Sequence, residues 1–339
     1  MKAAVLEGAK KLVVKDVPKP EANGKDVIMK VAACGLCGSD VHSFWPVGSL
    51  AGSIFGHEFC GTVEDPGDRT DLKVGDRICA AEINPCGKCE FCLSGREQLC
   101  LQLNADAPGI SRPGGYAEFV RVRSDLTRKL PDNVSFVEGG LIEPCAVSLH
   151  AARRGNIFSG AKVLVTGAGA IGLFAAYCAK FLGAGMVAIT AKAGSYRYAN
   201  AEKVEFIDHV YDGTSGNLVD RLLEVTNGKG FDTIIETTSA GAVRATALKA
   251  LGKHGTFVNV GFENDIYIEA VRPMILGEYS ITGSRFFQMK DFDDVIECLA
   301  TGKLQLERFA TTVKLDDIQS AFEASVSGHN NTVKYVVVV

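Results

Sequence analysis

The chain has 339 residues, of which 47% are hydrophobic and 22% are charged. This length exceeds what a single hydrophobic core usually supports, so we expect more than one domain. The 36 basic and 40 acidic residues give a formal net charge of −4 and are spread along the chain, which argues against a nucleic-acid or membrane partner.

The amino end and the cysteine count favour a cytoplasmic protein. The first twenty residues carry charges at short intervals and contain no apolar core of a secretory signal. Residues 163–179 are uncharged but include Thr166 and three glycines, and they are shorter than the about 20 apolar residues of a membrane span. Eleven cysteines, an odd number, argue against a disulfide framework and favour reduced thiols.

Two short stretches near the amino end carry mixed metal-binding side chains, CGLCGSDVH (34–42) and GHEFCG (56–61). A thiolate, an imidazole and a carboxylate with one vacant position are typical of a catalytic zinc site. Such an ion stabilises negative charge on a substrate oxygen. The candidate ligands are Cys37, His57 and Glu58. Taken alone, Cys34 and Cys37 also fit a redox pair.

Two further acids accompany this candidate site. Asp40 is a candidate acceptor for a hydrogen bond from His57, which would fix the imidazole tautomer. Glu143, in LIEPCAVSLH (141–150), is a candidate fourth ligand or a group that holds water near the metal.

A second, different cluster follows in CGKCEFCLSGREQLC (86–100). Four thiolates around one ion form a closed tetrahedral zinc site of the structural kind. Paired disulfides and an iron–sulfur cluster are the alternatives, and the reduced compartment disfavours the first of them. We therefore predict that a structural zinc is held by Cys86, Cys89, Cys92 and Cys100.

A glycine-rich turn follows the β-branched run 163–166 and precedes a helical pattern. The order strand, GxGxxG, helix is typical of a dinucleotide site, with the pyrophosphate at the helix N-terminus. An ordinary turn between a strand and a helix is the alternative. The candidate cofactor-binding residues here are Gly167, Gly169, Ala170, Ile171 and Gly172.

The acid that would bind the ribose of NAD about 20 residues later is missing. Residues 186–198 contain no Asp or Glu, and Ala191, Lys192 and Arg197 stand there instead. A carboxylate would repel a 2′-phosphate, whereas two cations can pair with it. The sequence therefore predicts NADP in preference to NAD. The alternative is that both cations belong to a solvated surface.

Short β-rich runs at 231–238, 255–262 and 279–284 continue the pattern, separated by helical or irregular segments such as 240–255. This alternation predicts an α/β fold with a doubly wound parallel sheet.

Together the motifs resemble the zinc-dependent medium-chain dehydrogenase/reductase family, and its polyol (sorbitol) dehydrogenase branch in particular. The resemblance covers nearly the whole chain in order. It is carried by CGLCGSDVH, GHEFCG, VGDRI (74–78), the four-cysteine segment, GGYAEFV (114–120), IEP (142–144), the glycine turn and the closing TVKYVVVV (332–339).

The resemblance implies a GroES-like β-barrel catalytic domain over residues 1–146, which contains the structural-zinc lobe. It implies a Rossmann domain over 147–282 and a C-terminal return to the catalytic domain over 283–339. It also implies a homo-oligomer of two or four chains.

The resemblance also implies roles for single residues. Cys37, His57 and Glu58 match catalytic zinc ligands, and Glu143 matches the glutamate near the metal. Ser39 and His42 match the groups that pass the alcohol proton outwards, with Ser39 and Glu143 beside the substrate. Arg285, in SRFF (284–287), is a candidate for binding substrate hydroxyls. Phe286 and Ser43 stand where the polyol branch has tyrosines, which weakens the case for sorbitol itself.

The expected activity is hydride transfer between a secondary alcohol, such as a polyol or sugar alcohol, and NADP(H), with two zinc ions per chain. The alternatives that keep the fold are an amino-alcohol of the threonine type, a phosphorylated polyol or a simple secondary alcohol as substrate, with NAD as a possible cofactor. A different class of alternative is a zinc-binding relative that has lost catalysis.

Overall fold

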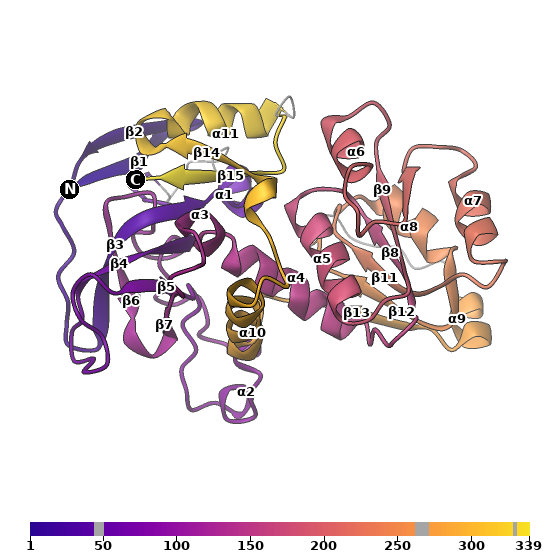
Figure 1. The fold of residues 1–339 in the computed structure, drawn as a ribbon, viewed down its shortest axis with the longest axis horizontal. Helices are drawn as coiled ribbons and strands as arrows, with labels where there is room; N and C mark the ends of the chain where they lie inside the picture. The colour runs from indigo at the N-terminus through magenta and orange to yellow at the C-terminus, as the bar shows by residue number, and fades with distance from the viewer. Residues whose placement is uncertain (44–50, 262–270, 328–330) are drawn as a thin grey trace. The chain divides into compact units, whose positions relative to one another are not determined.

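The computed structural model describes residues 1–43, 51–261, 271–327 and 331–339. They form two compact units (Figure 1). The first unit consists of Met1–Glu143 and Gln288–Val339, and the second of Pro144–Phe287. Each unit has its own sheet.

The first unit is built mainly of strands. They are β1 (Lys2–Gly8), β2 (Lys11–Asp16), β3 (Asp26–Gly35), β4 (Glu58–Asp65), β5 (Arg77–Ala80), β6 (Phe119–Arg123), β7 (Thr127–Lys129), β14 (Ala310–Lys314) and β15 (Lys334–Val338). Its helices are α1 (Gly38–Ser43), α2 (Glu90–Leu93), α3 (Phe136–Gly139), α10 (Met289–Ala300) and α11 (Ile318–Ser327). Short 3₁₀ turns are η2 (Glu97–Leu99), η3 (Ser124–Leu126), η4 (Glu307–Phe309) and η5 (Leu315–Asp317).

The strands of the first unit form a seven-stranded sheet in the order β14-β15-β3-β4-β5-β7, with β6 also paired to β3, and a separate hairpin β1-β2. The C-terminal strand β15 pairs with the end of β3, with Val337 opposite Cys34. The end of the chain therefore lies beside the strand that leads into the first metal motif.

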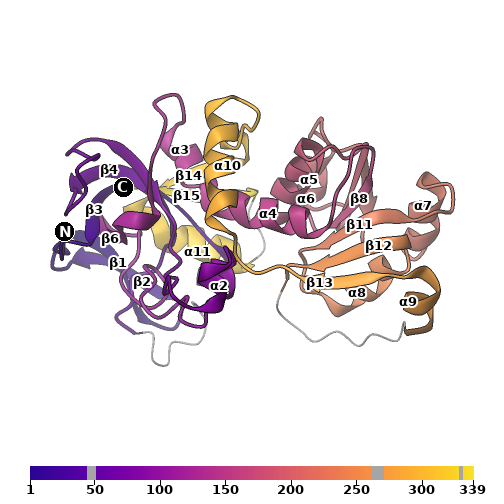
Figure 2. The same cartoon turned by 90° about the horizontal axis from the view of Figure 1, so that it is seen from below.

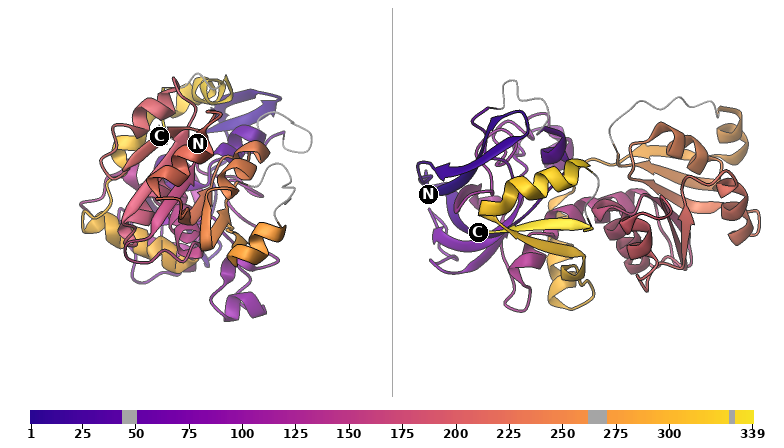
Figure 3. Two further views of the ribbon diagram at one scale, coloured as in Figure 1. Left: turned by 90° about the vertical axis from the view of Figure 1, so that its right-hand side faces the viewer. Right: turned by 90° about the horizontal axis from the view of Figure 1, so that it is seen from above.

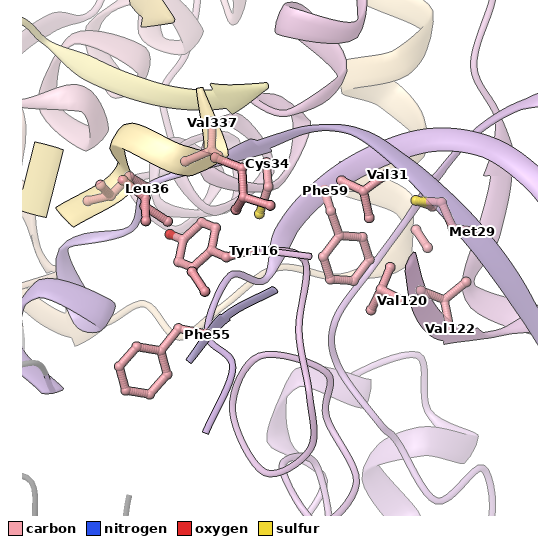
Figure 4. Packing of buried hydrophobic residues seen from close by; sticks show 14 of the residues in the cluster. Met29, Val31, Cys34, Leu36, Phe55, Phe59, Tyr116, Val120, Val122 and Val337 are labelled. Carbon is pink, nitrogen blue, oxygen red and sulfur yellow. The ribbon is translucent and has the colours of Figure 1, made fainter. Parts of the chain in front are cut away.

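Strand β3 is buried along most of its length, and Lys30 is its exposed residue. Figure 4 shows Met29 and Val31 of β3 close to Phe59, Val120 and Val122. Helix α11 closes the same core and lies against β2 and β14 (Figure 3).

The second unit alternates strands and helices. Its strands are β8 (Lys162–Thr166), β9 (Met186–Ala191), β10 (His209–Asp212), β11 (Phe231–Glu236), β12 (Leu251–Asn259) and β13 (Ser280–Gly283). Its helices are α5 (Ala170–Phe181), α6 (Tyr196–Ala201), α7 (Leu218–Val225), α8 (Gly241–Leu248) and α9 (Val271–Gly277). Helix α4 (Ile142–Arg154) begins in the first unit and continues into the second.

All pairings in this sheet are parallel, in the order β10-β9-β8-β11-β12-β13, with β13 at an edge (Figure 2). The chain order reverses between β8 and β11, whose last residues, Thr166 and Glu236, are register partners. Open parallel sheets bind ligands beyond the carboxyl ends of the strands at such a reversal. The predicted doubly wound parallel sheet is therefore confirmed, and the reversal lies directly at the glycine turn.

Among the described residues, no helix has the length and apolar character that crossing a bilayer requires.

Candidate metal and dinucleotide sites

The three mixed donors of the first metal motif lie together in the first unit. Cys37 stands in the turn between β3 and α1, while His57 and Glu58 lie at the start of β4. One ligand atom from each lies within 4.8 Å of the other two. The His57 and Glu58 side chains are buried, so a small ion at this point would be screened from bulk water.

The Asp40 carboxylate lies behind the imidazole of His57 at ion-pair distance, although among the described residues His57 Nδ1 has no partner at hydrogen-bond geometry. His57 Nδ1 lies 3.4 Å from Asp40 Oδ1, which leaves Nε2 as the ligand nitrogen. Asp40, on α1, accepts a 2.8 Å hydrogen bond from the buried Tyr116 hydroxyl. Figure 4 shows this tyrosine beside Cys34 and Leu36. The sequence motif predicted Asp40 but gave no signal for Tyr116.

A lysine from the last strand pairs with the carboxylate ligand. Lys334 Nζ donates a 2.6 Å hydrogen bond to Glu58 Oε1, and both side chains are buried. Among the described residues, Glu58 Oε2 has no hydrogen-bond partner. One carboxylate oxygen is thus occupied, and the other is left for a cation.

Two more buried carboxyl groups stand near the donors. Glu143, at the start of α4, is nearly inaccessible but is not one of the three grouped donors. Glu82 follows β5, is fully buried, and has no hydrogen-bond partner for either oxygen among the described residues. Sequence reasoning missed Glu82, although an acid inside the apolar run RICAAEI (77–83) is a usable signal.

Burial and crowding of negative groups raise the pKa values around the donors. Burial raises the pKa of Glu82 to about 7. Burial, then Glu82 and Glu58, raise the pKa of Glu143 well above its usual range. Burial alone would lower the pKa of His57, but Asp40 and Cys37 raise it well above normal. These directions follow from burial and from the crowding of acidic groups around the donors.

The residues fit a zinc ion by two tests. The donors are a sulfur, a nitrogen and an oxygen, the mixed set that zinc accepts in catalytic sites. The orphaned Glu58 Oε2 and the excess of buried acids both require a cation. The arrangement can therefore hold a divalent ion and direct it at a bound oxygen.

Two polar residues of α1 lead outwards from Cys37. The half-buried Ser39 hydroxyl lies 3.2 Å from Cys37 Sγ and donates to it. His42, one helical turn later, is exposed. Spacing of three residues puts both side chains on one side of α1, which suits the predicted proton path.

The four thiols of the second cluster also lie within 4.8 Å of one another, and all eleven cysteines are free of disulfides. Cys89 Sγ and Cys92 Sγ are 3.5 Å apart. Amides of Lys88 and Cys89 lower the pKa of Cys86 to about 6, which favours its thiolate form, whereas burial and then Cys89 raise the pKa of Cys92 to about 12. The disulfide alternative therefore finds no support.

The thiol lobe is attached to helix α10 of the same unit. Gln288 donates a 2.8 Å hydrogen bond to the Gly95 carbonyl, and the Met289 amide donates to Glu97 Oε1 at 2.6 Å. A carboxylate at a helix N-terminus is favourable. Folding of the lobe and the position of α10 are therefore linked.

The glycine turn has the geometry of a dinucleotide site. Gly167 adopts φ +91°, and a Cβ on Gly172 would stand 1.8 Å from the Gly167 carbonyl oxygen. Gly169 precedes α5, whose first residues are Ala170 and Ile171. The helix thus begins directly against the turn, and its free amides face any phosphate there.

The end of β9 and the segment that follows it, residues 186–198, carry no carboxylate of their own. Ala191 ends the strand, and Lys192 and Arg197 are exposed without an ion pair to any described residue. Arg197 Nη1 lies 3.8 Å from the point where a Cβ on Gly169 would stand. The nearby Asp212 Oδ1 already accepts hydrogen bonds from Ala193 and Thr214.

The candidate substrate residue Arg285 lies at the end of the second unit. It is exposed, and its guanidinium carbon is 5.5 Å from the Phe286 ring centre. Its relation to substrate stays a prediction.

Family models match both units of the chain. The alcohol dehydrogenase GroES-like domain matches residues 23–132, and the zinc-binding dehydrogenase model matches residues 170–301. The chain is 31% identical to a sorbitol dehydrogenase of Bacillus subtilis, over 99% of this chain and 97% of the relative.

Two solved structures share the whole fold. One from Sinorhizobium meliloti 1021, described as a zinc-binding dehydrogenase and bound to NADP, has a TM-score of 0.90 at 29% identity, covering 100% of this chain and 99% of its own. Galactitol-1-phosphate dehydrogenase of Escherichia coli has a TM-score of 0.90 at 25% identity, covering both chains fully.

The thiol geometry predicts two zinc ions in the intact protein and one after Cys92→Ser. The serine removes one of four donors, so the lobe loses its ion and the midpoint of thermal unfolding falls. Elemental analysis of purified protein measures both values, with Cys178→Ser as the buried control that keeps two. Two zinc ions in Cys92→Ser, or iron with visible absorbance in the parent, would contradict the assignment.

The Lys334–Glu58 pair predicts that Lys334→Met destabilises the first unit and loosens its metal. Removing one partner of a buried pair costs about 3–5 kcal/mol, because the other charge is left uncompensated. Chemical unfolding and the rate of zinc loss to a chelator measure the effect. Lys314→Met, at an exposed lysine on β14, is the control. Equal stability and equal zinc loss in both variants would show that the pair has no such role.

Proposed function

Because the chain belongs to the zinc-dependent medium-chain dehydrogenase/reductase family, we propose that it reversibly oxidises a secondary alcohol of a polyol or sugar alcohol to a ketone, with NADP as the hydride acceptor. The observation that carries this proposal is the buried group of Cys37, His57 and Glu58, with Glu58 Oε2 left unpartnered.

The proposed ligands of the catalytic ion are Cys37, His57 and Glu58, with Glu143 beside them. Zinc there would supply a Lewis acid that stabilises negative charge on the alcohol oxygen. Lys334 holds Glu58 by its other oxygen, and Asp40 keeps the His57 ring in one orientation. Glu143 is proposed to hold substrate or water at this point. The four thiols, from Cys86 to Cys100, are proposed to hold a second, structural zinc.

The alcohol proton must leave the buried site during oxidation. Ser39 is proposed to accept it, because its hydroxyl lies beside Cys37 and is only half-buried. His42 is then proposed to pass a proton to solvent, because its side chain is exposed and an imidazole ring carries both a donor and an acceptor nitrogen. A general acid–base relay of this kind contributes about 10²–10⁴-fold to rate.

The preference for NADP rests on charge at the end of β9. Lys192 and Arg197 offer two exposed cations, and Oδ1 of Asp212, the register partner of Ala191, accepts hydrogen bonds from Ala193 and Thr214. The NADP-bound relative structure supports the proposal. Use of NAD alone remains the alternative.

The substrate class is proposed from the relatives. Sorbitol dehydrogenase favours a free polyol, while galactitol-1-phosphate dehydrogenase favours a phosphorylated one as the second candidate. Arg285 is proposed to bind a substrate hydroxyl or phosphate. We also propose a cytoplasmic homo-oligomer, for which the edge strand β13 offers unpaired backbone groups to a partner.

The proposal predicts alcohol-dependent reduction of NADP⁺ by sugar alcohols, and loss of this activity in Cys37→Ala. Loss of a metal ligand removes the charge stabilisation, so turnover should fall at least about 100-fold. A spectrophotometric screen of polyols, phosphorylated polyols and simple secondary alcohols measures it, with Cys298→Ala as the control. Full activity of Cys37→Ala would refute the proposed site, and activity on none of the alcohols would refute the function.

The cofactor proposal predicts that Arg197→Leu weakens NADP⁺ and spares NAD⁺. A lost hydrogen bond to a charged group is worth about 1.5–3 kcal/mol, so the KM for NADP⁺ should rise roughly 10- to 100-fold while that for NAD⁺ changes little. Initial rates with both nucleotides test this, with the exposed Lys203→Leu as control. A parent enzyme that uses NAD⁺ equally well would overturn the preference.

A further inference from the structure

A buried ion pair stands where the sheet of the second unit reverses its order. Glu236 ends β11 and is fully buried, and Arg244, on α8, is almost as inaccessible. Arg244 Nε donates a 2.9 Å hydrogen bond to Glu236 Oε2, and its Nη2 donates to the Gly261 carbonyl. This pair lies outside both metal sites and is not part of the glycine motif.

The other oxygen of Glu236 stabilises the turn that follows β11 by accepting hydrogen bonds from it. Glu236 Oε1 accepts hydrogen bonds from the Thr238 amide at 2.6 Å and the Ser239 amide at 3.1 Å, and from the Thr238 hydroxyl. Ser239 has φ +61°, a conformation that costs a non-glycine residue about 1–2 kcal/mol. Hydrogen bonds to a carboxylate are strong enough to offset that strain.

The turn formed by residues 237–239 packs directly on the glycine turn. Thr238 Cγ2 is 2.7 Å, and Thr237 Oγ1 3.0 Å, from the point where a Cβ on Gly167 would stand. The Thr237 hydroxyl also donates a 2.6 Å hydrogen bond to the carbonyl of Thr166, the last residue of β8. Any shift of this turn therefore moves the backbone on which a pyrophosphate would lie.

We propose that the Glu236–Arg244 pair is a positioning element for the dinucleotide. The pair holds residues 237–239 in a strained turn. This turn fixes the backbone position of the glycine turn and forms one side of the cofactor site. The pair acts through the turn and touches no reacting atom. This inference rests on the proposed function, because it requires the chain to bind a nicotinamide dinucleotide.

Two double variants test separately the hydrogen-bond acceptor that Glu236 offers to the turn and the charge of the Glu236–Arg244 pair. Glu236→Gln with Arg244→Met keeps one carbonyl oxygen for the turn amides, whereas Glu236→Leu with Arg244→Met removes it; neither leaves an unpaired buried charge. We expect the Gln variant to bind NADPH within about threefold of the parent, and the Leu variant to bind at least tenfold more weakly. Adding Ser239→Gly to the Leu variant should restore part of the affinity, because glycine adopts positive φ without strain.

A second pair of variants moves the turn without touching either charge. A Cβ on Gly261 would stand 2.5 Å from the Ser239 amide nitrogen, whereas one on Gly241 would meet no atom within 4 Å. Gly261→Ala should therefore weaken NADPH binding at least tenfold, while Gly241→Ala should leave it unchanged. This comparison decides the question even where the Leu double variant does not fold.

The measurement is the dissociation constant of NADPH by fluorescence titration of the full, zinc-loaded chain, well below each variant's unfolding midpoint. Zinc content should equal that of the parent throughout, because the first unit is untouched. Parent-like binding by the Leu double variant or by Gly261→Ala would overturn the positioning role alone. A parent that binds neither NADPH nor NADH would instead overturn the proposed function, and this inference with it.

Discussion

The first unit is organised around an excess of buried negative charge. Its buried acidic groups include Asp40, Glu58, Glu82 and Glu143, and among the described residues the buried Lys334 is a cation that stands with them. Ionised groups that lose water need an opposite charge at close range. Without one they take up protons, which is why the pKa of Glu82 reaches about 7 and that of Glu143 rises well above its usual range. A divalent ion at the three grouped donors would offset part of this excess, so metal binding would stabilise the unit.

The need for a positive charge beside the buried acids explains the place of strand β15 next to β3, because β15 carries Lys334. The donors lie in the turn after β3 and at the start of β4. The lysine that pairs with Glu58 is Lys334 on β15, 276 residues later in the chain. The packing leaves little freedom: a Cβ on Gly35 would stand 1.9 Å from Glu58 Oε2. The register between β15 and β3 thus determines whether Lys334 reaches its partner. A one-residue slip would turn the lysine to the opposite face of the sheet.

Short sequence motifs predicted the sites whose functional residues lie close together in the sequence. The glycine turn, the four thiols and the Cys37, His57 and Glu58 donors all come from short stretches, and the structure brings each set together. Lys334, Tyr116 and the Glu236–Arg244 pair were not predicted. The roles of Lys334 and Tyr116 come from contacts between distant segments, and that of the Glu236–Arg244 pair comes from a turn that packs on the distant glycine turn. A lone lysine in an apolar strand or an arginine in a helix has many ordinary explanations. Glu82 is the intermediate case, since an acid in an apolar run signals burial without naming its neighbours.

Two arginines of the second unit, Arg197 and Arg244, differ in exposure, and we expect them to have different roles. Arg197 is exposed and pairs with no described residue, so its charge is available to a ligand but largely screened by water until one binds. Arg244 is buried and already bonded to Glu236 and Gly261, so it has no charge to offer a ligand and fixes backbone instead. A change at Arg197 should therefore alter which dinucleotide is preferred, whereas a change at the Glu236–Arg244 pair should weaken both dinucleotides alike. The two effects are separable because the 2′-phosphate distinguishes NADP from NAD, while the pyrophosphate at the glycine turn is common to both.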